Sequence, residues 1–211
     1  MKLTNYEHAC FAVEKDRKVI VIDPGSLTTD FVVSHNIVAI IMTHAHSDHL
    51  DTDLISEIIN KNPHAVIIGT EEVTTKLNIY ETRTVHGGDG FAIEGFDLDF
   101  YGNTHARIHK DLPKNQNVGV LIEDRVYFPG DSFTMPGKDV EILALPVAGP
   151  WMKAEEAIDF MIAVGARFTF PTHDTILSTS GKTIADNTIG GFSEVAGTDY
   201  RRIDGETIEI D

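Results

Sequence analysis

The sequence predicts an α+β protein in which two β-sheets are covered by helices. Three observations predict it. Short runs of β-branched and aromatic residues recur along the chain, turn-forming residues separate them, and two amphipathic helical patterns fall between them. No low-complexity linker or internal repeat interrupts this order. We therefore expect one domain that spans residues 1–211.

The expected strands are apolar runs bounded by turn signals such as EKDRK, DPG and EDR. In chain order they are 9–13, 18–23, 36–43, 65–70, 91–102, 118–123, 125–130, 141–147, 168–172 and 206–210. Close spacing of the first two, and of those in the middle of the chain, favours hairpins.

Two segments have helical periodicity. Residues 51–62 place Leu54, Ile55, Ile58 and Ile59 on one face, with Asp51 or Thr52 as the N-cap. Residues 153–166 place four further apolar residues on one face, namely Ala154, Ile158, Met161 and Ile162. Glycines interrupt the pattern of residues 179–197, so the sequence does not define helix boundaries there.

Composition excludes several classes of protein. The chain is 42% hydrophobic and 24% charged, as in globular proteins with a packed core. Its apolar runs of about six residues are far below the roughly 18 to 20 that cross a bilayer, and no signal core is present, so we expect a cytoplasmic protein. A net charge of −16 argues against a nucleic-acid partner, although bound dications would let the protein accept small anions.

Cys10 is the only cysteine, so no internal disulfide and no thiolate metal site is expected. We interpret it as a small buried residue of a strand. The oligomeric state cannot be read from the sequence.

Unusual polar residues follow four of the expected strands directly. They are His44, His46, Asp48 and His49 after 36–43, His105 after 91–102, Asp131 after 125–130 and His173 after 168–172. If these strand ends meet at one edge of the sheets, they form a metal site on rigid supports. Imidazole and carboxylate ligands without thiolate suit zinc, iron or manganese and argue against a structural zinc cluster.

Seven candidate ligands are more than one ion needs, since a single ion takes three or four protein ligands. Residues two apart in an extended segment point the same way, so His44 and His46 could bind one ion while Asp48 and His49 reach another. The sequence therefore predicts two divalent metal ions, with zinc preferred and manganese or iron as alternatives.

The segment THAHSDH resembles the His-x-His-x-Asp-His signature of the metallo-β-lactamase superfamily. VIDPG, GNTHA, FPGDS and PTHD resemble its other motifs, in the same order along the chain. The resemblance implies a four-layer αββα sandwich, with two mixed sheets flanked by helices and a dinuclear site at one edge. YEHACF and ALPVAGPWMKAEEAIDF are most similar to small bacterial metal-dependent hydrolases related to the ascorbate-6-phosphate lactonases.

The resemblance also implies how the ligands divide. One metal would take His44, His46 and His105, the other Asp48, His49 and His173, with Asp131 bridging both. Asp23 would orient the ligand loop by hydrogen bonds. His8 resembles a histidine near the pocket of lactonase-like relatives, although a structural role is an equal alternative.

Other histidines are not assigned to the metals. His109 competes with His105 for the third motif, but His105 follows its strand more closely, so we prefer it and expect His109 to face the substrate or solvent. Trp151 could form a wall of the pocket or belong to the core. Surface or turn positions are expected for His35, His64 and His86.

The sequence thus predicts a metal-dependent hydrolase for a small ester, lactone or phosphodiester, in which two ions lower the pKa of a bound water toward about 7. Asp48, Asp131 and His109 are the candidates for proton transfer. Two alternatives remain: a mononuclear iron dioxygenase of the persulfide-oxidising type, and a metal-binding scaffold without turnover.

Overall fold

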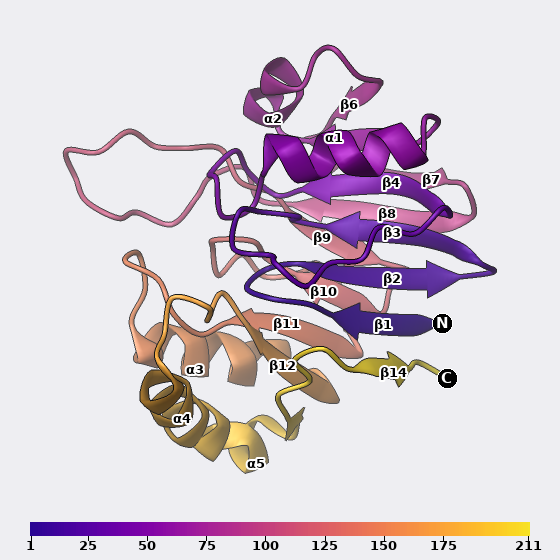
Figure 1. Cartoon of the computed structure of the whole chain (residues 1–211). Helices are drawn as coiled ribbons and strands as arrows, with labels where there is room; N and C mark the ends of the chain where they lie inside the picture. The colour runs from indigo at the N-terminus through magenta and orange to yellow at the C-terminus, as the bar shows by residue number, and fades with distance from the viewer.

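The computed structural model describes residues 1–211 and contains two seven-stranded sheets that pack face to face (Figure 1). The first sheet has the order β14-β1-β2-β3-β4-β5-β6. Its strands are β1 (Lys2–Asn5), β2 (Phe11–Lys15), β3 (Lys18–Ile22), β4 (Ile37–Met42), β5 (Val66–Gly69), β6 (Thr82–Thr84) and β14 (Thr207–Glu209).

The second sheet has the order β13-β12-β11-β10-β9-β8-β7. Its strands are β7 (Gly90–Ile93), β8 (Phe96–Tyr101), β9 (Gly119–Ile122), β10 (Val126–Phe128), β11 (Ile142–Pro146), β12 (Phe168–Thr172) and β13 (Asp199–Tyr200). Both sheets mix parallel and antiparallel pairs, as expected.

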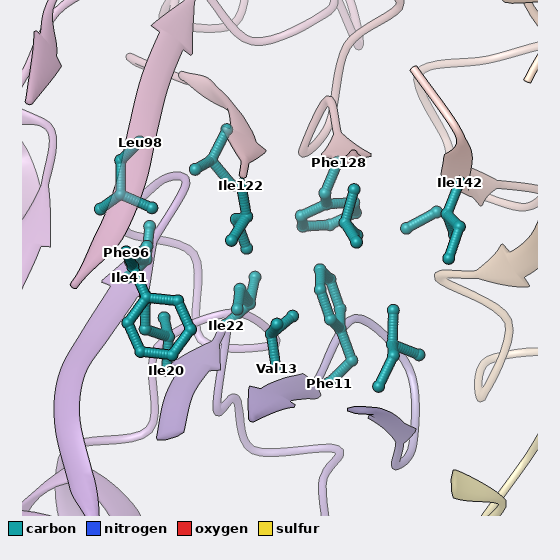
Figure 2. Close-up of a cluster of buried hydrophobic side chains, with 14 of the residues drawn as sticks. Phe11, Val13, Ile20, Ile22, Ile41, Phe96, Leu98, Ile122, Phe128 and Ile142 are labelled. Atoms are coloured by element: carbon teal, nitrogen blue, oxygen red, sulfur yellow. The ribbon is translucent and has the colours of Figure 1, made fainter. Parts of the chain in front are cut away.

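The main core lies between the sheets, and the period-two alternation of strands builds it. Phe11 and Val13 of β2 point into this core, whereas Ala12 between them faces the outer layer. Figure 2 shows side chains of the two sheets pointing toward one another across the interface. The Phe11 ring packs edge-on against Phe128, with ring centroids 5.6 Å apart, so aromatic contacts join the sheets.

Helices cover the outer faces and complete the αββα sandwich (Figure 1). On one side lie α1 (Thr52–Lys61) and α2 (Glu71–Lys76), and on the other α3 (Ala154–Val164), α4 (Thr179–Thr188), the 3₁₀ turn η1 (Gly190–Phe192) and α5 (Ser193–Ala196). Asp51 is the N-cap of α1, because its side chain accepts from the backbone N–H groups of Asp53 and Leu54. None of these helices is long and apolar enough to cross a bilayer.

The buried face of α3 differs from the expected one. Ala157, Phe160 and Met161 are buried against the second sheet, while Ala154 and Ile162 are exposed. The sequence pattern could not distinguish the two faces, because apolar residues occur all around this helix.

The sequence did not predict several short helices and strands. The expected strand 91–102 is a hairpin, in which β7 and β8 pair antiparallel around Glu94 and Gly95. The strands β1, β6 and β13 and the helix α2 were not expected. These elements have two to six residues, too few to show periodicity.

The strand directions decide where the polar residues meet. The pairs β8–β9 and β9–β10 are antiparallel, so β8 runs parallel to β10, and the β10–β11 and β11–β12 pairs are parallel. The carboxyl ends of β8, β10 and β12 therefore lie at the same edge of the second sheet. The residues that follow β4 of the first sheet reach this edge as well.

Candidate metal centre

Two groups of four side chains converge at this edge. His44, His46, His105 and Asp131 form one group, and His8, Asp48, His49 and His173 form the other. Within each group the candidate ligand atoms lie within 4.8 Å of one another. The structure thus brings together all seven side chains that the sequence singled out and adds His8.

The loop after β4 carries four of these side chains, and the DPG segment supports it. Gly25 packs against the backbone of Asp48, where a β-carbon would lie only 1.8 Å from the Asp48 carbonyl oxygen. The Ser26 N–H donates to the Ser47 carbonyl over 2.8 Å. Glycine is therefore required at position 25 to let the two loops approach.

Asp23 is fully buried and orients the ligand loop by three hydrogen bonds. Its carboxylate accepts from the N–H and hydroxyl of Thr43 at 2.7 and 2.6 Å, and from Nδ1 of His49 at 2.6 Å. With Nδ1 occupied, Nε2 of His49 faces Asp131 Oδ1 at 3.2 Å. This arrangement matches the orienting role that the sequence resemblance implied for Asp23.

Asp131 lies between the two groups. Its Oδ2 is 3.2 Å from Nε2 of His105 and 3.1 Å from Nε2 of His173, while Oδ1 faces His49. Asn117 holds the segment in place, because its side-chain oxygen accepts from the Asp131 N–H and its amide donates to the Pro129 carbonyl, both over 2.9 Å. One carboxylate can therefore contact ions in both groups.

The charges of the cluster shift several pKa values. Burial raises the pKa of Asp131, but the neighbouring His49, His105 and His173 outweigh it and hold this pKa well below its usual value. Burial lowers the pKa of His173, but Asp131 and Asp48 outweigh it and raise this pKa to about 9. The carboxylates thus create a field that attracts a proton or a metal ion at the histidine nitrogens.

Burial lowers the pKa of His44 well below its usual value. The ring is therefore neutral at pH 7, as a metal ligand must be. Nε2 of His44 lies 3.0 Å from Nδ1 of His46, so two imidazole nitrogens face the same point.

Orphaned buried atoms test whether the residues fit metal ions. His49 Nε2, His105 Nε2, His173 Nε2 and Asp131 Oδ1 are all buried and lack a hydrogen-bond partner, although they lie close together. Such groups cost free energy unless something satisfies them. A donor set of imidazoles and carboxylates that face common points fits divalent cations of the zinc, manganese or iron type.

His8 belongs to the second group. Its side chain is fully buried, and Nε2 lies 3.2 Å from Asp48 Oδ2. The His173 N–H donates to the His8 carbonyl over 2.8 Å, and both residues have positive φ angles, 60° and 61°. The structure favours a site-related position for His8 over a purely structural one.

Trp151 lies at the site, where its ring centroid is 6.0 Å from that of His105 and 6.1 Å from that of His173. It also packs against Phe133, so it joins the core and the site. Its Nε1 is buried without a partner.

His105, and not His109, enters the cluster. His105 is buried and His109 has a side chain that is 59% exposed, with Nδ1 accepting from the Asp111 N–H over 3.2 Å. His35, His64 and His86 are exposed, as expected.

Asn115 was missed by the sequence analysis. Its side-chain amide contacts Nε2 of His46, while Nδ1 of that ring faces Nε2 of His44 over 3.0 Å. Asparagine is an ordinary loop residue, so no signal in the sequence distinguished it.

Comparison with known proteins agrees with this geometry. A family model described as "Beta-lactamase superfamily domain" matches residues 2–173, which hold the whole cluster. This chain is a member of the metallo-β-lactamase superfamily. A Mycobacterium tuberculosis protein is 31% identical to this superfamily member, over 98% of both chains.

Two further relatives have informative names. A Flavobacterium johnsoniae protein named "UPF0173 metal-dependent hydrolase" is 26% identical over 84% of this metallo-β-lactamase superfamily chain and 78% of its own. The solved structure of Igni18, described as a metallo hydrolase from Ignicoccus hospitalis, has a TM-score of 0.76 and 20% identity, and the match covers 100% of this chain and 99% of Igni18. The similarity to Igni18 shows that the two proteins share a fold.

Proposed function

We propose that this metal-dependent hydrolase cleaves a small ester, lactone or phosphodiester at a dinuclear metal site. One observation carries the proposal: Asp131 touches both groups of ligands, so its carboxylate can join two ion positions. Hydrolase names among the relatives support the reaction class. The substrate is a small molecule in this proposal.

The residues would divide between two ions as follows. His44, His46 and His105 would hold the first, Asp48, His49 and His173 would hold the second, and Asp131 would contribute to both. Two bound divalent ions supply an activated water and polarise the scissile group. Zinc is the preferred ion because most of the ligands are imidazoles; iron is an alternative for the same reason, and manganese because the set also contains carboxylates.

The protein's own contribution is to orient the ligands and to handle a proton. Asp23 fixes the tautomer of His49, and Asn115 fixes the ring orientation of His46. Asp48 is better placed for proton exchange than Asp131, because its side chain is 28% exposed and that of Asp131 only 3%. Burial raises the pKa of Asp48, but His173 and His8 outweigh it and lower the pKa, so the carboxylate stays ionised at pH 7.

His109 stays a candidate for proton transfer from the loop above the site, where it lines the same cavity as His105. Trp151 excludes water from the side of the site between His105 and His173. A separate cavity of about 420 Å³, lined by residues such as Glu7, Asp174 and Lys182, contains none of the seven ligands in its wall. We therefore place the substrate at the metal edge. The cytoplasm is our proposed location, since the single cysteine is buried and unpaired.

The replacement His46→Ala tests the proposal. We expect it to lower both metal content, measured by elemental analysis, and hydrolysis of a panel of lactones, thioesters and phosphodiesters. His64→Ala removes an exposed histidine and serves as the matched control. The proposal would be contradicted if His46→Ala hydrolysed a substrate as fast as the parent protein and a chelator stopped that hydrolysis in the parent. Oxygen consumption with one bound iron would instead favour the dioxygenase alternative.

A further inference from the structure

We propose that the loop from Arg107 to Lys114, here called the basic loop, binds an anionic group of the substrate, a carboxylate or a phosphate, beside the metal centre. The inference rests on the proposed function in one respect: it takes the metal centre as the place where the substrate reacts. It adds a substrate class that the metal ligands do not define.

The charge of the basic loop is opposite to that of the chain. The loop contains three basic residues, Arg107, Lys110 and Lys114, and only one acidic residue, Asp111. The whole chain, in contrast, has 33 acidic and 17 basic residues. Lys110 pairs with Asp111 at 2.7 Å. Arg107 and Lys114 are exposed and form neither an ion pair nor a side-chain hydrogen bond. Two uncompensated positive charges therefore project from a strongly acidic protein.

The base of the loop is tied to the metal centre. The His105 N–H donates to the Asn115 carbonyl over 3.0 Å, and the Ala106 N–H donates to the Asp131 carbonyl over 2.8 Å. Figure 1 shows the segment between β8 and β9 projecting beyond the ends of the strands. An anionic group bound by the loop would thus lie at a fixed position relative to His105 and Asp131, two of the proposed metal ligands.

A cavity exists where the anion would bind. Ten residues between His105 and Asn115 line a cavity of about 110 Å³, and the wall includes Arg107, Lys114 and His105. This space is larger than the roughly 10–15 Å³ that a single buried water requires, so it can admit a small polar group.

Electrostatics favours an anion at this position. Cationic side chains beside a site for divalent ions repel those ions, and an anion between them is attracted by both. The net charge of −16 repels anions at long range, so a local positive patch beside the ions strengthens the capture of an anion. Because Arg107 and Lys114 have no acidic partner, their charges are free to supply that patch.

The loop also offers apolar contact. Ile108 is 40% exposed and Leu112 is 51% exposed, between the cationic positions. Exposed apolar side chains next to unpaired cations suit a ligand whose anionic group is carried on a carbon chain. The inferred substrate class is therefore an anionic ester, lactone or phosphodiester with an aliphatic part.

Calorimetry on the metal-loaded protein tests this without turnover. The probes are the α,ω-dicarboxylates from glutarate to suberate, each compared with the monocarboxylate of the same carbon number. One carboxylate can occupy the metal centre and the second the loop, so we expect at least one dicarboxylate to bind tenfold or more tightly than its partner. Comparison of 4-phosphonobutyrate with glutarate shows whether a phosphonate, as a stand-in for phosphate, binds more tightly than a carboxylate on the same carbon chain.

The double variant Arg107→Gln/Lys114→Gln should retain the metal ions and lose the dicarboxylate preference by tenfold or more. Arg17→Gln/Lys61→Gln removes the same charge from other exposed positions and should keep the preference. No preference in the parent at any length, or a preference that survives in the loop variant, overturns the proposal. A loop-dependent preference without hydrolysis of any substrate would leave the anion site standing and contradict the proposed function alone.

Discussion

Nε2 of His8 lies 3.2 Å from Oδ2 of Asp48, and the His8 side chain has no exposed surface. His8 lies in the loop between β1 and β2 and Asp48 in the loop after β4, 40 positions apart in the chain. A buried imidazole at this distance either donates to the carboxylate or shares an ion with it. In both cases His8 fixes the position of Asp48.

We predict that His8→Ala weakens binding of the ion held by Asp48, His49 and His173. Loss of a residue that orients a ligand costs about 10- to 100-fold in metal affinity. Titration of the metal-free protein with Zn²⁺ measures it, and His35→Ala is the control because its side chain is exposed. If both Zn²⁺ binding constants of His8→Ala equal those of the parent protein, His8 has no role at the metal.

The contact between Asp23 and His49 gives a second prediction. Asp23→Asn keeps the shape but cannot accept from both Thr43 and His49 as a carboxylate does. We expect metal affinity to fall about tenfold or more, and the free energy of unfolding to fall by about 1–3 kcal/mol because a buried partner is lost. Urea denaturation with and without metal measures both, and Asp53→Asn is an exposed control. Asp23→Asn with parental metal affinity would contradict the orienting role.

Metal binding should release protons. His173 has a pKa raised to about 9 in the metal-free protein, because Asp131 and Asp48 outweigh the lowering by burial. The ring is therefore protonated at pH 7 and must lose this proton to bind an ion. We expect Zn²⁺ affinity to rise about tenfold per pH unit for each proton released, from about pH 6.5 to 8. Binding enthalpies that do not change between buffers of different ionisation enthalpy would refute it.

The same shift predicts how the stability of the metal-free protein depends on pH. The folded-state pKa of His173 is higher than its unfolded value, so its contribution is fully present below about pH 6.5 and is lost as pH rises through about 9. Urea unfolding in the presence of a chelator should therefore show stability that declines over this range. His173→Gln should flatten the decline, and an equally steep decline in that variant would assign it to other groups.

The inter-sheet core should be sensitive to cavities. Phe128→Ala removes a fully buried ring that packs against Phe11 (Figure 2), and we expect a loss of about 3–5 kcal/mol of unfolding free energy. Phe192→Ala changes a 43% exposed ring in η1 and should cost much less. Equal losses in the two variants would mean that the contact between the sheets does not dominate stability.

Much of the site could be predicted because its signals are local. His44, His46, Asp48 and His49 stand directly after a strand of six buried or nearly buried residues, and His105, Asp131 and His173 follow other strands in the same way. Apolar runs bounded by turn signals likewise identified most long strands. The face of α3 was right for Ile158 and Met161 but wrong for Ala154 and Ile162, because apolar residues surround this helix. The strands β1, β6 and β13 were missed because their lengths give no period.

By itself, the sequence determined which side chains can donate ligand atoms to a metal and which strands these side chains follow. Both are properties of neighbouring residues. Only the tertiary structure decided that Asp131 lies between two groups, that His105 rather than His109 enters the cluster, and that His8 and Asn115 adjoin it. These relationships depend on strand order and on contacts between residues far apart in the chain, such as Asn115 and His46, which are 69 positions apart. Sheet pairing, not local propensity, sets such distances.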